Sequence, residues 1–239
     1  MSTSTPAPAS AAPEIEYPDC DGEPMSDNTL QFRWIVTVQG GVDALFRIDP
    51  AVFVAGDLLW YPVQGDNVTR TAPDTMVVFG RPKGYRGSYR QWEEGGIAPQ
   101  VVFEILSPSN RAGEQERKCQ FYQRFGVEEY YLYDPDNVVL EGWIRAGAVL
   151  QPVPQMDGWV SPRLGTRFDL SGDELRIIGP DGRPFLTYLE IVEQVEQERQ
   201  RAEQERQRAD EQRHLTERER QRAERLEAQL RALGVEPEG

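Results

Sequence analysis

The sequence is poor in the side chains that build disulfide frameworks and soft metal sites. Its 239 residues include two cysteines, Cys20 and Cys119, and a single histidine, His214. Two cysteines cannot form a disulfide framework, and with one histidine they cannot assemble a zinc site of the Cys/His type. Any metal ion bound by this chain would therefore have to be held by oxygen atoms.

Long apolar runs and an excess of basic residues are also absent. No run approaches the roughly 18 to 20 apolar residues that span a bilayer, and the first residues lack a basic segment followed by an apolar one. We therefore expect no membrane partner and a cytoplasmic location. The formal net charge of −14 opposes non-specific attraction to nucleic acid, so nucleic-acid binding would depend on a local basic patch.

Composition divides the chain into three parts. Residues 1–24 are rich in Pro, Ala and Ser, which predicts a flexible arm, and residues 25–188 have the apolar patterns of a folded domain. Residues 189–239 are predicted to form a charged helical tail. Its seven-residue repeat, QERQRAE followed by QERQRAD, places Ala202 and Ala209 at one heptad position, while the second core position is mostly polar. The tail is predicted to be either a solvated helix or a coiled coil that binds a partner or a second copy.

Hydrophobic periodicity predicts a mixed α/β fold for the middle of the chain. A first helix is expected after a capping residue at Ser26 or Asp27, and the Gly40–Gly41 pair is a place where it could break. A second helix is expected over residues 113–125, and residues 144–186 should form a smaller β-rich cap. The expected strands are VFVAG, LLWYPV, TMVVFG, QVVFEIL, EYYLYDP and the segment from Val138 to Trp143.

Charged residues interrupt the apolar patterns of this domain at three places. Glu104 lies inside QVVFEIL, although ionised carboxylates are rarely buried without a cation, hydrogen-bond donors or a metal. Asp74 stands at the start of TMVVFG, and Lys118 shares a helix face with Tyr122 and Phe125 that should point toward the sheet. Two acids on one sheet with a lysine facing them from a helix are typical of centres that hydrolyse phosphodiester bonds with a hard divalent cation.

With these residues the chain resembles the Uma-two family of restriction-endonuclease-like proteins, within the PD-(D/E)XK nuclease superfamily. The resemblance spans about residues 28–188 and implies a mixed β-sheet core flanked by helices. Position 106, where the strict motif has lysine, is Leu106, and Lys118 would replace that lysine from the following helix. The similar segments are AGDLLWYP, APD, MVVFGRPKG, VVFEILSPSN, ERKCQFYQRFGVEEYYLYDPD and GWVSPRLGTRFDL.

The resemblance also implies a chemistry. Asp74, Glu104 and Lys118 would be the catalytic residues, and Mg²⁺ or Mn²⁺ would be held at Asp74, Glu104 and Ile105. Many superfamily members add a glutamate from the first helix, where this chain has Gln31. The predicted function is a metal-dependent endonuclease acting on DNA, and the alternative is an inactive nuclease-fold binding module that acts through its helical tail. A further alternative is that Glu104 and Lys118 form a buried ion pair with a purely structural role.

A basic, glycine-rich loop between the two acidic motifs could supply the local patch that nucleic-acid binding requires. The segment GRPKGYRGSYRQW carries Arg81, Lys83, Arg86 and Arg90 among aromatic residues, which predicts contacts with phosphates and bases. Arg111 would add to the same side. The alternative is an exposed loop whose arginines pair with neighbouring glutamates, and the sequence favours neither. A homodimer is also expected, because nucleases that cut both strands are commonly symmetric pairs.

Overall fold

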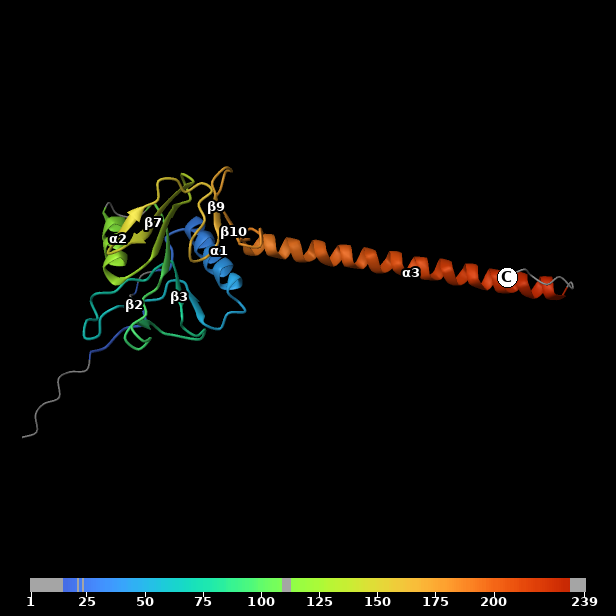
Figure 1. Cartoon of the computed structure of the whole chain (residues 1–239), viewed down its shortest axis with the longest axis horizontal. Helices are drawn as coiled ribbons and strands as arrows, with labels where there is room; N and C mark the ends of the chain where they lie inside the picture. The colour runs from blue at the N-terminus through green and yellow to red at the C-terminus, as the bar shows by residue number, and fades with distance from the viewer. Residues whose placement is uncertain (1–14, 21, 23, 109–112, 233–239) are drawn as a thin grey trace, which may run out of the picture. The chain divides into compact units, whose positions relative to one another are not determined.

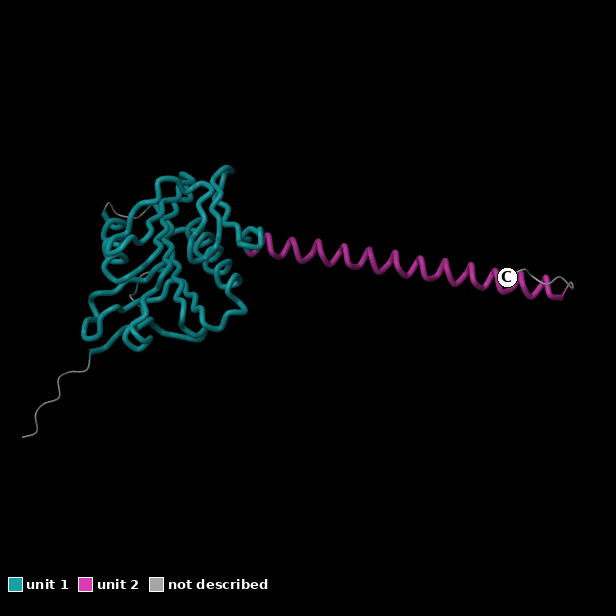
Figure 2. Tube along the Cα trace, in the orientation of Figure 1, with its two compact units in different colours: residues 1–187 teal, residues 188–239 magenta. Residues whose placement is uncertain are grey.

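The computed structural model describes residues 15–20, 22, 24–108 and 113–232 (Figure 1). By its internal contacts the chain divides into two compact units, residues 1–187 and residues 188–239 (Figure 2). The expectations for the first part of the arm and for Arg111 lie outside the described residues. Within the described part of the chain, no helix is both long enough and apolar enough to cross a membrane.

A six-stranded mixed sheet forms the centre of the first unit. Neighbouring strands are antiparallel except for β5 and β6, which run parallel and are connected through helix α2 (Glu114–Phe125). Parallel strands need such a crossover, and it places α2 on one face of the sheet. In spatial order the strands are β1 (Val52–Ala55), β3 (Thr75–Phe79), β5 (Val101–Ile105), β6 (Glu129–Asp134), β7 (Val139–Ala146) and β8 (Val149–Pro152).

Helix α1 (Thr29–Leu45) covers the opposite face of the sheet. It begins after Asn28, whose side-chain oxygen accepts a hydrogen bond from the backbone N–H of Gln31 at 2.8 Å. The expectation of a cap at Ser26 or Asp27 is therefore wrong. Asn is as good an N-cap residue as Asp, so the cap preference alone does not choose between neighbouring positions.

Helix α1 continues through Gly40 and Gly41, where a break was expected. A Cβ atom on Gly41 would lie 2.2 Å from the ring of Phe185, whereas one on Gly40 would meet nothing within 4 Å. The glycine at position 41 lets an aromatic ring approach the helix backbone closely. Close packing against Phe185 therefore explains the glycine at position 41. The helix continues through this position.

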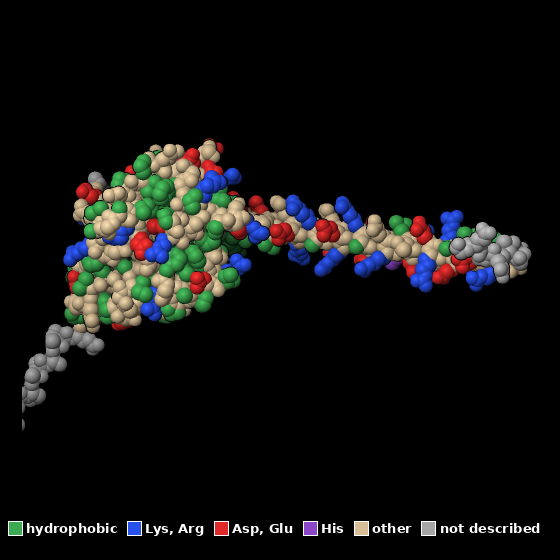
Figure 3. All heavy atoms as spheres, in the orientation of Figure 1, with side chains coloured by type: hydrophobic (Ala, Val, Ile, Leu, Met, Phe, Trp, Pro, Cys, Tyr) green, Lys and Arg blue, Asp and Glu red, His purple; other side chains and the backbone are tan. Residues whose placement is uncertain are grey.

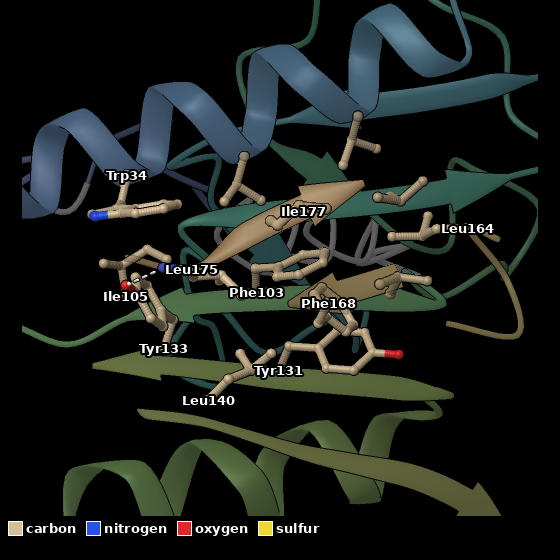
Figure 4. Packing of buried hydrophobic residues seen from close by; sticks show 14 of the residues in the cluster. Trp34, Phe103, Ile105, Tyr131, Tyr133, Leu140, Leu164, Phe168, Leu175 and Ile177 are labelled. Carbon is tan, nitrogen blue, oxygen red and sulfur yellow. Dashed lines mark hydrogen bonds between the residues drawn. The ribbon is translucent and has the colours of Figure 1, made fainter. Parts of the chain in front are cut away.

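Each face of the sheet is filled by one apolar cluster. The cluster under α1 includes Trp34, Phe103 and Ile105, and it is completed by residues of the β9–β10 hairpin, such as Phe168 and Ile177 (Figure 4). The cluster under α2 contains Val102, Tyr122, Tyr130 and Trp60. Successive residues of a strand point to opposite faces, so Glu104 shares the α2 face with Val102. The bounds of the hairpin strands are Arg167–Asp169 for β9 and Arg176–Ile178 for β10.

Two segments differ from the expected strand pattern. The run LLWYPV contributes only β2 (Trp60–Tyr61), which pairs in parallel with β4 (Tyr89–Arg90) instead of joining the main sheet. Residues 144–186 do not form a separate cap throughout, because β8 is the last strand of the main sheet and only β9 and β10 form a hairpin of their own. Strands this short carry almost no periodic signal.

Part of the expected N-terminal arm is bound to the domain. The ring of Tyr17 lies 5.3 Å from that of Tyr61 and 4.9 Å from that of Trp92, measured between centroids. The hydroxyl of Tyr61 donates a hydrogen bond to the carbonyl oxygen of Pro18 at 2.6 Å. The expectation of a flexible arm over residues 1–24 is therefore wrong for residues 17 and 18.

The second unit is helix α3 (Tyr188–Ala232), a 45-residue helix without a buried side chain. Basic and acidic side chains alternate along its length (Figure 3). Pairs one turn apart, such as Arg220 and Glu224 at 2.9 Å, stabilise an exposed helix by about 0.2 to 0.5 kcal/mol each. The helical character of the tail agrees with the heptad pattern, and its pairing with another helix stays a prediction.

Candidate active site

The pairing of β3 with β5 brings Asp74 and Glu104 together. Thr75 is the partner of Phe103 in this antiparallel pair, so Asp74 and Glu104 stand opposite each other one residue further along. Both are buried, with exposed fractions of 8% and 4%. Asp74 Oδ2 also accepts a hydrogen bond from the backbone N–H of Ile105 at 2.6 Å. The structure thus brings together the two carboxylates that the sequence pattern singled out.

Helix α2 supplies two hydrogen-bond donors to Glu104. Lys118 Nζ donates to Glu104 Oε2 at 2.8 Å, and the hydroxyl of Tyr122 donates to Glu104 Oε1. The two donors are four residues apart and therefore lie on the same face of the helix. Tyr122 is fully buried and its ring stacks on Trp60, with centroids 6.4 Å apart. Lys118 thus faces inward as predicted, whereas the hydrogen bond from Tyr122 could not be foreseen from a residue type that is common in cores.

These side chains surround a small pocket between α1, the sheet and α2. Its cavity volume is about 30 Å³, and both carboxylates and the ammonium group border it. Gln31 closes the side of the pocket that belongs to α1. The lining residues are Gln31, Asp74, Glu104, Ile105, Leu106, Gln115, Lys118, Tyr130 and Leu132.

The charges in this pocket favour an additional cation. Burial, reinforced by the negative charge of Glu104, raises the pKa of Asp74 well above its usual value. Burial by itself would lower the pKa of Lys118, but the charge and hydrogen bond of Glu104, together with Asp74, outweigh burial and raise that pKa. The ammonium of Lys118 is paired with Glu104, whereas Asp74 lacks a compensating positive charge, which a bound divalent cation would supply.

Comparisons with known proteins identify the family. A family model described as "Uma2: Putative restriction endonuclease" matches residues 13–175, which is more than half of the chain. The chain belongs to the Uma2 family. No curated protein matches it. Among solved structures it is similar to a crystal structure described as a putative nuclease belonging to DUF820 from Anabaena variabilis, with 16% identity and a TM-score of 0.43, over 56% of this chain and 73% of that one.

The Uma2 match confirms the resemblance that the sequence motifs suggested. The matched region contains Asp74, Glu104 and Lys118, together with the whole six-stranded sheet, and it excludes helix α3. The mixed sheet with helices on both faces and a long C-terminal helix is the expected fold class. At the level of the family, the chain is related to nucleases.

In this Uma2 protein, a glutamine from α1 stands beside the pocket where many superfamily members have a glutamate. Gln31 Nε2 donates a hydrogen bond to the carbonyl oxygen of Ile105 at 2.9 Å, which an ionised glutamate could not do. Gln31 Oε1 in turn accepts a hydrogen bond from the backbone N–H of Asp27 at 2.8 Å. Gln31 therefore fixes the backbone of β5 directly after Glu104.

The oxygen atoms of the pocket suit a hard divalent cation. Asp74 and Glu104 offer carboxylate oxygens, and Ile105 offers a backbone oxygen. Mg²⁺ commonly uses one or two carboxylates and keeps water molecules as its other ligands. The described residues contain no group of three or more His, Cys, Asp or Glu side chains that could hold a metal, so water would complete the coordination. The donor set thus fits Mg²⁺ or Mn²⁺ and does not fit zinc.

The cations of the basic loop over residues 81–90 are paired with neighbouring acids, four cations with three carboxylates. Glu94 pairs with two arginines of this loop, and the guanidinium of Arg86 also lies over the ring of Phe53 at 4.0 Å. This arrangement agrees with the alternative of a loop whose arginines pair with glutamates, and phosphate contacts by the loop stay a prediction. The pairs are Arg81–Glu94 (3.1 Å), Arg86–Glu94 (2.5 Å), Arg90–Glu93 (3.5 Å) and Lys83–Asp43 (2.7 Å).

Proposed function

We propose that this Uma2 protein is a metal-dependent endonuclease that hydrolyses phosphodiester bonds in DNA. The observation that carries the proposal is that two buried carboxylates, Asp74 and Glu104, share one pocket with a single lysine. A Glu104–Lys118 pair is already neutral, so an ionised Asp74 beside it adds a buried negative charge that a bound cation would balance. The description of the family as restriction endonucleases supports the same class of reaction.

In this proposal Asp74, Glu104 and the backbone oxygen of Ile105 would hold Mg²⁺ or Mn²⁺, and the ion when bound would supply a Lewis acid for a phosphoryl oxygen and for water. Lys118 is kept protonated by the two carboxylates, so its ammonium can orient the attacking water and offset the charge that builds on the phosphoryl oxygens. Tyr122 is a positioning residue, because its hydroxyl holds Oε1 of Glu104 from inside the core.

Cleavage assays on the full chain test this proposal. Supercoiled plasmid, linear duplex, single-stranded DNA and RNA would be incubated with Mg²⁺ or Mn²⁺, and we expect cleavage of DNA that EDTA abolishes. Asp74→Asn should lower the rate at least about 100-fold, because it removes a charged ligand from the proposed cation. Asp136→Asn is the matched control, since Asp136 is exposed in the turn after β6, and its rate should equal that of the unmodified protein.

Two results would contradict the proposal. One is the absence of cleavage with every substrate and both metals, and the other is equal cleavage by the unmodified protein and Asp74→Asn. The first result would favour a nuclease-fold binding module that acts through helix α3. Capture of a binding partner by the full chain, lost on deletion of residues 188–239, would then support that alternative.

A further inference from the structure

A second group of arginines surrounds a groove on the outer side of α2. The groove has about 800 Å³ of empty space and lies between α2 and the segment that follows β2. Arg70 from that segment and Arg117 and Arg124 from α2 supply its charge. The half-buried rings of Phe121 and Phe125 supply its apolar surface. The groove is therefore both cationic and aromatic.

These three arginines differ from the cations of loop 81–90, which are paired with acids. In the part of the chain that the structure describes, no carboxylate lies within ion-pair distance of any of the three guanidinium groups. Arg70 donates a hydrogen bond to the carbonyl oxygen of Asn67 at 3.2 Å, and Arg124 lies over the ring of Phe125 at 5.0 Å. The carboxylate of Asp66 accepts backbone hydrogen bonds from its own turn, and the charge of Arg124 acts on it from beyond ion-pair distance.

Residues on both walls of the groove are close in sequence to residues of the proposed active site. Arg117 and Arg124 are two turns apart on one face of α2, about 10 Å along the helix axis. Lys118 is the next residue after Arg117 and reaches Glu104. On the other wall, only three residues separate Arg70 from Asp74.

The buried ring of Trp60 packs between the aromatic residues of the groove and Tyr122 of the site. It packs against Phe121 and Phe125, with centroids 5.3 Å and 6.3 Å away, and it stacks on Tyr122. Tyr122 is the residue whose hydroxyl bonds Glu104. The aromatic surface of the groove and the support of the catalytic carboxylate are thus parts of one packed cluster.

We propose that this groove binds the phosphodiester backbone of the nucleic-acid strand that the active site cuts, with Arg70, Arg117 and Arg124 as its phosphate contacts. The inference rests on the proposed function and adds the substrate-binding surface to it. Arginine suits this role because its planar guanidinium can give two parallel hydrogen bonds to a phosphate. The rings of Phe121 and Phe125 provide flat surfaces on which a base can stack. In a chain with a net charge of −14, a cluster of unpaired arginines is the local positive patch that binding to phosphates requires.

Binding of fluorescently labelled oligonucleotides tests the inference. The full chain would carry Asp74→Asn, so that nothing is cut, and fluorescence anisotropy would be followed with single-stranded and duplex DNA over a range of NaCl concentrations. Replacing Arg70, Arg117 and Arg124 with Gln should weaken binding about 10- to 1,000-fold, and the slope of log K against log salt should fall by about 2 to 3. We call this the groove variant.

The matched control removes the same charge from the ion-paired loop. Arg81→Gln, Lys83→Gln and Arg90→Gln together should leave the affinity within about twofold, because these cations are already paired with acids. Thermal unfolding of each variant would verify the fold. If Arg70→Gln lowers stability by removing its contact with the Tyr61 ring, the pair Arg117→Gln and Arg124→Gln on the exposed helix face repeats the test.

The outcomes separate this inference from the proposed function. If the unmodified protein cleaves DNA while the groove variant binds normally, the proposed role of the groove is wrong and the nuclease function stands. If the protein binds through the groove but cuts nothing, the nuclease function fails and the groove stands as a nucleic-acid site. The inference is also overturned if no oligonucleotide binds, or if the loop control loses affinity and the groove variant does not.

Discussion

Two glutamates are buried on neighbouring strands of one sheet, in very different surroundings. Glu104 on β5 is 4% exposed, and Glu129 on β6 is 1% exposed. Glu129 accepts hydrogen bonds from the hydroxyls of Tyr131 (2.8 Å) and Ser161 (2.5 Å) and from the backbone N–H of Arg163 (2.6 Å). Glu104 is instead bonded by a lysine and a tyrosine and stands beside a second acid.

The comparison shows that a buried carboxylate does not by itself mark a reactive centre. The donors around Glu129 are neutral groups, and they tie the turn after Ser161 to β6. No second carboxylate shares its hydrogen bonds among the described residues. At Glu104, the lysine neutralises only one of two acids, and a pocket is open beside them. We therefore assign a structural role to Glu129 and a metal-binding role to Glu104.

The largest expected effect is a difference in the rate of DNA cleavage between variants of the two glutamates. Glu104→Gln should lower DNA cleavage at least about 100-fold, because it removes charge from the proposed cation site. Glu129→Gln should leave the rate per folded molecule within about threefold, since Glu129 lies outside the pocket. Both rates would be measured with Mn²⁺ on the same plasmid, and similar losses in the two variants would remove the distinction.

The second-largest effect should appear in stability, where the substitution at Glu129 should cost more than the substitution at Glu104. Glu129→Ala should lower the free energy of unfolding by about 2 to 4 kcal/mol, because two hydroxyls and one N–H lose their buried acceptor. Glu104→Gln should lower it by less than Glu129→Ala does, since the glutamine oxygen can still accept a hydrogen bond from Lys118 or Tyr122 and the repulsion between the two acids is removed. Urea unfolding in EDTA would give both values, and a larger loss at Glu104 would contradict this account.

The smallest effect concerns pH. The pKa of Asp74 is raised in the folded state by burial and by Glu104, so folding favours its protonated form. Without divalent ions, its contribution to stability should therefore be lost as the pH rises from the ordinary carboxyl range through the raised pKa. Asp74→Asn should gain stability relative to the unmodified protein over that range. Urea unfolding at a series of pH values would reveal the trend, and a constant difference would argue against an isolated buried charge at Asp74.

Much of the domain could be predicted from periodicity, and the deviations have physical reasons. Strands β3 and β5 and helix α2 have clear apolar patterns, and their bounds agree closely with expectation. The β2–β4 pair has two residues per strand, which is too short for any pattern to appear. The close approach of Phe185 to Gly41 could not be predicted, because the two residues are far apart in the sequence.

The candidate site was partly visible in the sequence. Asp74, Glu104 and Lys118 stood out because charges interrupt apolar stripes. The hydrogen bonds from Tyr122 and Gln31 could not be predicted, because tyrosine is ordinary in a core and glutamine is ordinary on a helix. Ion pairing of the basic loop was one of the two alternatives that the sequence left open, and the structure pairs both Arg81 and Arg86 with Glu94.

Titration calorimetry with Mn²⁺ on the full chain at neutral pH tests the central claim most directly. The account predicts binding by the unmodified protein and by Glu129→Gln, and no binding by Asp74→Asn or Glu104→Gln. Absence of binding to the unmodified protein, or equal binding to all four, would contradict the assignment of a cation to the pocket between Asp74 and Glu104.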